Sequence, residues 1–178
     1  CKSSSSDLTL ILIEVLSSCE LEGNKVEHDR WIEVLARLIE KIEPNVVERE
    51  TIIVKSVKFS SGGSNQKNPL MHKLLARIMA KEQNYEQARY HYLLSKDGVG
   101  CAKILIQLSA KAFNSEVDMV LVQVVLNLLV LNEKGTALET FDYYTKYHPK
   151  IRTYQPPFHT PLLNFAYFLL HIIDEKKL

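Results

Sequence analysis

The sequence has few of the residues that build a disulfide-bonded or zinc-stabilised domain. It contains three cysteines in 178 residues, an odd number, and no two of them form a C-x-x-C pair. A disulfide framework uses an even set of cysteines, and a zinc knuckle uses closely spaced pairs. The cysteine content therefore argues against both scaffolds and is typical of a protein that folds in a reducing compartment.

Long apolar runs and strand patterns are also missing. The two longest nearly apolar stretches, 119–131 and 162–173, are shorter than the ~18–20 apolar residues that a membrane span needs. Alternating runs bounded by turn residues, which would indicate β-strands, do not recur along the chain. We therefore expect neither direct membrane insertion nor a sheet.

The chain lacks a strong charge of either sign. It has 22 Lys and Arg against 21 Asp and Glu, a net charge of +1, so a strongly basic nucleic-acid binder is excluded. Residues 51–111 nevertheless carry 10 basic and 3 acidic groups, after a first segment, 1–50, with 6 basic and 11 acidic groups. We interpret the basic middle as solvated helix faces; the alternative is a surface that steers an acidic partner.

Helix signals, in contrast, recur throughout. Apolar spacing, capping residues and prolines predict nine helices, over about 7–19, 27–42, 45–59, 68–83, 84–94, 97–108, 115–131, 133–147 and 160–174. Asp7, Asn45 and Asn68 are the expected N-caps of the first, third and fourth helices. In the first helix we expect the core face to hold Leu8, Leu12, Val15 and Leu16. The seventh helix is apolar nearly all round, so we expect it to be the most buried.

Short turns between these helices indicate antiparallel hairpins, which can pack as a closed bundle or stack as a solenoid. Tyr85, Ala88 and Tyr92 favour stacking. An aromatic residue followed three positions later by alanine lets helices of tetratricopeptide hairpins approach closely, although an ordinary helix crossing explains the spacing too. We predict an all-α fold, a tetratricopeptide-like α-solenoid, with residues 1–178 forming a single repeat domain.

The sequence contains no recognisable catalytic, metal or cofactor motif. The glycines at 62–63 and 98–100 lack the strand and the G-K-[ST] ending of a phosphate-binding loop, so we interpret them as turns and caps. The six histidines form no H-E-x-x-H or other short ligand pair. Cys101 follows Gly100 near a helix start, where a thiol can acidify, but we favour a buried core cysteine. We therefore predict no catalytic residue and no cofactor.

The last predicted helix is apolar in all directions and follows the segment Pro156-Pro157-Phe158. A terminal helix of a monomer needs a solvated face. Either a further helix, missing from this chain, covers it, or it binds a partner; both readings are compatible. The residues that we expect at a partner surface are Pro156, Pro157, Phe158, Leu162, Phe165, Tyr167 and Phe168.

An ordered set of segments resembles the Golgi-to-ER traffic protein 4 family. These segments lie at 59–64 (FSSGGS), 81–85 (KEQNY), 89–92 (RYHY), 97–102 (DGVGCA), 115–119 (SEVDM), 146–149 (KYHP), 156–158 (PPF) and 161–165 (PLLNF). The resemblance implies a non-enzymatic α-solenoid that acts in the cytosol as an adaptor for post-translational delivery of tail-anchored membrane proteins. It also implies that this chain is a fragment that lacks the N- and C-terminal helices of the family.

The resemblance implies two kinds of partner. One is a targeting ATPase, bound through N-terminal helices that we expect to be missing here. The other is a ubiquitin-like-domain protein or a BAG-type chaperone scaffold, bound by the C-terminal half. The alternative function is a chaperone-like module that binds transmembrane helices directly, in a groove lined by the apolar helices at 117–131 and 162–173.

Overall fold

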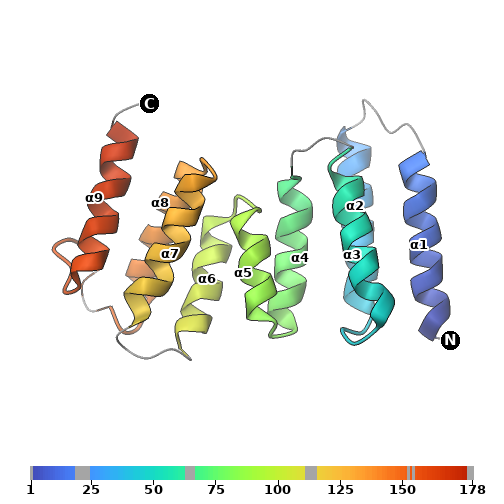
Figure 1. The fold of residues 1–178 in the computed structure, drawn as a ribbon, viewed down its shortest axis with the longest axis horizontal. Coiled ribbons are helices and arrows are strands. Elements are labelled where there is room, and N and C mark those ends of the chain that lie inside the picture. The colour runs from blue at the N-terminus through green and yellow to red at the C-terminus, as the bar shows by residue number, and fades with distance from the viewer. Residues whose placement is uncertain are drawn as a thin grey trace. The chain divides into compact units, whose positions relative to one another are not determined.

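The computed structural model describes residues 2–18, 25–62, 67–110, 116–151, 153 and 155–175, and these residues form helices without any strand (Figure 1). The predicted all-α class is confirmed. The helices are α1 (Lys2–Ser18), α2 (Lys25–Lys41), α3 (Val47–Ser60), α4 (Pro69–Lys81), α5 (Tyr85–Leu93), α6 (Gly98–Ser109), α7 (Val117–Val130), α8 (Lys134–Tyr147) and α9 (Pro161–Glu175).

The chain divides into two compact units, residues 1–84 and 85–178. In the first unit α1 packs against α3, and α2 packs against both α3 and α4. Helices that are second neighbours along the chain therefore contact each other in this unit. Its core is mostly aliphatic, with Ile13, Leu16, Ile32, Leu35, Ile39, Ile52, Phe59, Met71 and Leu75 buried together.

The register of α1 differs from the prediction. The helix begins at Lys2, so Asp7 lies within it and is not its N-cap. The buried face carries Ser6, Thr9, Ile13 and Leu16, whereas Leu8 and Val15 are exposed. Leu12 is partly buried. Because nearly every second residue of this segment is apolar, its hydrophobicity does not by itself identify the face that meets α3.

The expected cap of α4 is confirmed, and that of α3 is wrong. Asn68 Oδ1 accepts hydrogen bonds from the backbone N–H groups of Leu70 (3.0 Å) and Met71 (3.4 Å). This is the usual way in which an asparagine satisfies the free donors at a helix start. Helix α3, in contrast, is capped by Val46, one residue after Asn45, without a side-chain hydrogen bond.

In the second unit α8 occupies the centre, in contact with α6, α7 and α9. The start of α6 lies so close to α8 that a Cβ atom on Gly98 would be 2.8 Å from the Thr136 carbonyl oxygen. Cys101, three residues later, is completely buried, and burial raises the pKa of its thiol to about 12. The interpretation of Cys101 as a core residue is confirmed.

Helix α7 is less enclosed than we expected. One side is buried through Leu121, Val125 and Leu128, but Met119 and Val130 on the opposite side are exposed. Composition alone suggested burial all round. Helices α5, α6, α8 and α9 contact α7, and the exposure of Met119 and Val130 shows that they leave one side of it uncovered.

Candidate partner-binding surface

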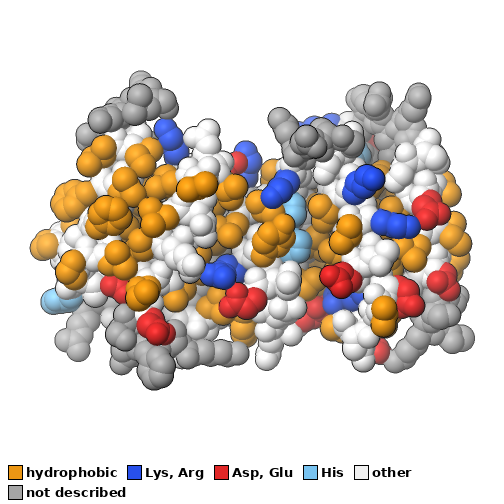
Figure 2. Space-filling model, viewed as in Figure 1, with side chains coloured by type: hydrophobic (Ala, Val, Ile, Leu, Met, Phe, Trp, Pro, Cys, Tyr) orange, Lys and Arg blue, Asp and Glu red, His pale blue; other side chains and the backbone are white. Residues whose placement is uncertain are grey.

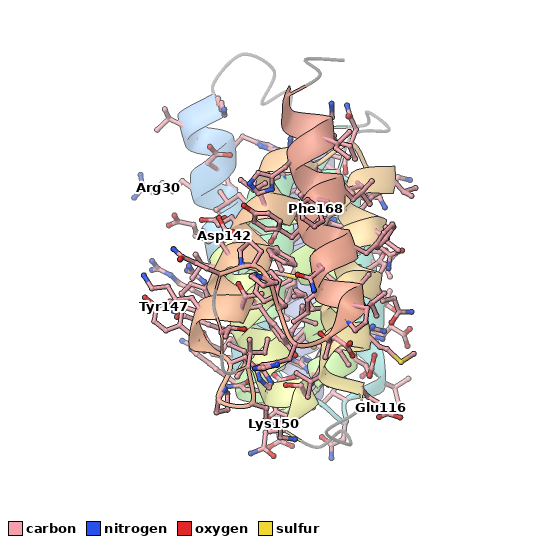
Figure 3. The ribbon with its side chains drawn as sticks, turned by 90° about the vertical axis from the view of Figure 1, so that its left-hand side faces the viewer. Arg30, Glu116, Asp142, Tyr147, Lys150 and Phe168 are labelled. Atoms are coloured by element: carbon pink, nitrogen blue, oxygen red, sulfur yellow. The ribbon has the colours of Figure 1, made fainter. Side chains whose placement is uncertain are left out.

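Helix α9 has one buried side and one exposed apolar side. Leu163, Ala166 and Leu170 are buried against the rest of the unit. Phe165, Phe168 and Ile172 are 54%, 58% and 52% exposed, and their spacing places them in one stripe along the helix. Figure 3 shows this helix nearest to the viewer, with Phe168 labelled. We call these three residues the α9 stripe.

An aromatic cluster supports the stripe from beneath. The ring of Phe141 in α8 meets Phe158 edge to face, with centroids 5.8 Å apart. Tyr167 of α9 completes the cluster, at 6.1 Å from Phe158 and 6.3 Å from Phe141. Edge-to-face aromatic pairs add directional attraction to the burial of their area. The cluster therefore fixes the position of α9 on α8.

Asn164 joins the start of α9 to the segment before it. Its Oδ1 accepts a hydrogen bond from the backbone N–H of Phe158, and its Nδ2 donates to the Phe158 carbonyl, both at 2.8 Å. The same Nδ2 lies 3.3 Å from the Thr160 carbonyl. One side chain thus satisfies both backbone groups of Phe158 and holds its ring in the core.

The structure divides the predicted surface residues into three groups. Phe165, Phe168 and Pro157 are exposed; Pro156, Leu162 and Tyr167 are half-buried. Phe158 is buried, so it supports the stripe and does not belong to the exposed surface. Its burial depends on Phe141, which lies 17 positions away in the chain, so the local Pro-Pro-Phe motif alone gave no sign of it.

The predicted partner-surface residues did not include two parts of this surface, which the sequence had indicated only for the alternative of a groove lined by the apolar helices at 117–131 and 162–173. Ile172 is seven residues after Phe165, so helical spacing would have placed it in the stripe. On α7, exposed apolar side chains are contributed by Met119, Leu126 and Val130. Figure 2 shows hydrophobic side chains gathered over α7 and α9 on the face in view. The two helices pack against each other, so they form one apolar region.

The proposed hairpin-packing residues lie at the start of the second unit. Ala88 and Tyr92 are buried in α5, and Tyr85 is half-buried. The ring of Tyr92 lies against Gly100, where an added Cβ would be 2.4 Å from Cε1. The small residue that makes room for this tyrosine is therefore a glycine of α6. From the sequence we had expected Ala88 to play that role for a neighbouring ring.

One buried serine–histidine pair could be mistaken for a catalytic dyad. His148 Nε2 lies 2.7 Å from Ser109 Oγ, while its Nδ1 accepts a hydrogen bond from the Lys150 backbone N–H at 3.1 Å. The proton is therefore on Nε2, which donates a hydrogen bond to Ser109 Oγ. The Ser109 hydroxyl in turn donates to the Ile106 carbonyl oxygen. A general base would have to accept the serine proton. This pair has the opposite polarity and joins α6 to the end of α8.

Other candidate sites can be placed only in part. Among the described residues, no group of three His, Cys, Asp or Glu side chains is arranged to hold a metal ion. The same part of the chain contains no helix with the length and hydropathy to cross a membrane. Cys1, Cys19 and Ser115 and most of the glycine-containing loop, residues 63–66, lie outside the described residues.

The chain is similar to known proteins along nearly its whole length. The family model for Golgi to ER traffic protein 4 matches residues 2–178. A Golgi to ER traffic protein 4 homolog from Bos taurus is 44% identical over 179 aligned residues, which cover 99% of this chain and 54% of that protein. The homolog from Homo sapiens is 43% identical, covering 99% and 53%. Homolog B from Xenopus laevis is 40% identical, covering 99% and 54%.

The chain thus spans about half the length of the curated relatives that it matches. The names of these relatives denote traffic proteins and not enzymes. The resemblance expected from the ordered segments is confirmed, and the chain belongs to the Golgi to ER traffic protein 4 family.

Proposed function

We propose that this chain is part of a non-catalytic cytosolic adaptor in traffic to the endoplasmic reticulum, in which the α9 stripe binds a protein partner. The relatives are named for Golgi to ER traffic, and the proposal extends that role to this chain. The observation that carries it is the exposed row of Phe165, Phe168 and Ile172 on a helix that packs through Tyr167 against the rings of Phe141 and Phe158. Large exposed apolar side chains in a row are typical of binding surfaces.

Within this proposal the cargo is a tail-anchored membrane protein. The partner at the α9 stripe is a ubiquitin-like-domain protein or a BAG-type chaperone scaffold, and a targeting ATPase binds elsewhere on the full protein. The 1–178 chain forms one tetratricopeptide-like solenoid of antiparallel hairpins. Packing between second neighbours, α1 on α3 and α7 on α9, supports stacking over a closed bundle.

The stripe is tested by Phe168→Asp, which places a charge in the middle of the apolar row. Val54→Asp on α3 is the matched control, because Val54 is 62% exposed and belongs to the other unit. We expect Phe168→Asp in the full-length protein to abolish pull-down of the partner while helical circular dichroism is unchanged. Equal pull-down of both variants would remove the stripe from the proposal.

A second candidate is direct binding of transmembrane helices. The apolar region over α7 and α9, with Met119 and Val130 exposed besides the stripe, favours it. A photoreactive residue at Leu126 and another at Phe168 separate the two functions. An adaptor should crosslink to the partner at position 168, and a chaperone should crosslink to a tail-anchored client at both positions.

A further inference from the structure

The connection from α8 to α9 begins at a buried histidine that uses both of its ring nitrogens. His148 is 3% exposed. Its Nδ1 accepts a hydrogen bond from the Lys150 backbone N–H at 3.1 Å, and its Nε2 lies 2.7 Å from Ser109 Oγ of α6. Because Nδ1 is an acceptor, the neutral ring carries its proton on Nε2. These contacts therefore fit one tautomer of the uncharged imidazole.

The backbone of His148 belongs to the same turn, residues 148–151. Its N–H donates to the Tyr144 carbonyl at 2.9 Å, and its carbonyl accepts from the Ile151 N–H at 3.1 Å. The imidazole also stacks on the ring of Tyr144, with centroids 4.7 Å apart and planes inclined by 28°. Figure 3 labels Lys150 in this turn. One residue thus ends α8, closes the turn that follows and joins that turn to α6.

A proton on Nδ1 is incompatible with this arrangement. A protonated imidazole has two N–H donors and no acceptor, so its Nδ1–H would face the Lys150 backbone N–H. That amide would lose its partner, and a positive charge would form on a buried ring. Burial, and secondly the charge of Lys150, lower the pKa of His148 from 6.5. The ring is therefore neutral and the turn closed at pH 7.

The surroundings of the ring do not offset this charge. Among the described residues, the groups against it are the Ser109 hydroxyl on α6 and the Tyr144 ring on α8, and the charge that acts on it is the Lys150 ammonium. Asp118, at the start of α7, acts on the Tyr144 hydroxyl instead. Protonation of His148 thus gains no ion pair here that would compensate for the lost hydrogen bond.

We propose that His148 is a pH-sensitive latch, in which protonation of Nδ1 breaks the hydrogen bond from Lys150 and opens the turn at 148–151. From this turn the chain runs on to Phe158, whose ring packs between α8 and α9. Opening the turn removes the attachment of the connection to α6 and to the end of α8. The latch is a property of the chain without a partner, so it stands or falls separately from the proposed function.

Nuclear magnetic resonance of the full-length protein with isotope-labelled histidine and lysine tests the latch directly. We expect the Nε2–H tautomer of His148 at pH 7, and protonation of the ring between pH 6.5 and pH 5. Over the same range, protection of the Lys150 amide against hydrogen exchange should fall by about tenfold, after correction for intrinsic exchange rates. The Nδ1–H tautomer at pH 7, a ring still neutral at pH 5, or an amide that stays protected beside a protonated ring would each overturn the proposal.

His148→Asn separates the latch from general effects of acid. The asparagine Oδ1 does not titrate, and it can accept from the N–H two residues on, as in an Asx turn. We expect the variant to keep the Lys150 amide protected at both pH 7 and pH 5. His159→Asn is the matched control, because His159 is exposed in the same connection, and it should respond to acid like the unmodified protein. Equal acid responses in all three proteins would overturn the proposal.

Discussion

The Glu139 side chain of α8 accepts a hydrogen bond from the backbone N–H of Gly98 through Oε2, at 2.9 Å. A carboxylate at this place satisfies a free donor at the start of α6 and is favoured by the helix dipole. Thr140, the next residue, donates from its hydroxyl to the Thr136 carbonyl at 2.7 Å, and the same oxygen lies 3.3 Å from the Gly98 carbonyl oxygen. Two adjacent side chains of α8 thus lie against the backbone of one glycine, and Glu139 makes the hydrogen bond to it.

Gly98→Ala should therefore destabilise the second unit. The new Cβ would lie 2.6 Å from Glu139 Oε2 and 2.8 Å from the Thr136 carbonyl oxygen, and the latter belongs to a helix backbone that cannot yield easily. We expect a loss of about 1–3 kcal/mol in the free energy of unfolding, measured with urea. Gly135→Ala in α8 is the control, because nothing lies within 4 Å of its added Cβ. It should be neutral or stabilising by up to about 1 kcal/mol, and equal effects of the two changes would refute this account of Gly98.

Asn164→Ala should loosen the support of the α9 stripe. The change removes the acceptor and the donor that hold the backbone of Phe158. Leaving such partly buried groups without partners costs about 1–3 kcal/mol. In the variant, hydrogen exchange at Phe158 and in the first turn of α9 should become faster than in the unmodified protein, while exchange in α6 should not change. Unchanged exchange at these amides would show that the aromatic cluster alone positions the helix.

Stability should decrease at mildly acidic pH through His91. Burial lowers the pKa of this imidazole to about 4, from 6.5. The folded state then binds the proton less readily than the unfolded chain. The contribution of neutral His91 to the free energy of unfolding is therefore complete above pH 6.5 and is lost as the pH falls towards 4. Between pH 7 and pH 5 the loss should be about 2 kcal/mol. His91→Gln should reduce this pH dependence in urea unfolding, and an identical slope in the variant would contradict the assignment.

The buried ion pair of the first unit offers a contrast with exposed pairs. Arg49 is buried and donates from Nη1 to Glu82 Oε2 at 3.0 Å, while its Nη2 contacts Oε1. Glu82→Ala would leave a buried charge unpaired and should cost about 3–5 kcal/mol. The double variant Arg49→Met with Glu82→Leu should recover most of that loss. Glu14→Ala, which breaks the exposed pair with Lys55, should cost less than about 1 kcal/mol, and a similar cost for Glu82→Ala would contradict the account.

Much of the fold could be predicted from local sequence, and the exceptions have physical reasons. Helix positions followed from apolar spacing and from caps such as Asn68, whose acceptor lies next to the donors it satisfies. The predictions that were wrong concerned which face of a helix is buried. Neither the outward turn of Leu8 nor the exposure of Val130 is encoded nearby, because it depends on which neighbouring helix covers each side.

The candidate surface was predicted in part for the same reason. Phe165 and Phe168 stood out as apolar residues on a terminal helix, and both are exposed. Phe158 was also predicted to lie at the surface, but its ring packs against Phe141 of α8. The contact between Glu139 and Gly98, 41 residues apart, likewise has no local signature. Long-range packing therefore separates the residues that support the surface from those that form it.

The central claim, that the α9 stripe binds a protein partner, is tested most directly by a photoreactive phenylalanine analogue at position 168 of the full-length protein. Crosslinking in cells, followed by mass spectrometry, identifies what lies against this side chain. The account predicts crosslinks to a ubiquitin-like-domain protein or a BAG-type scaffold. Crosslinks confined to another helix of the same chain, or to tail-anchored clients, would contradict it.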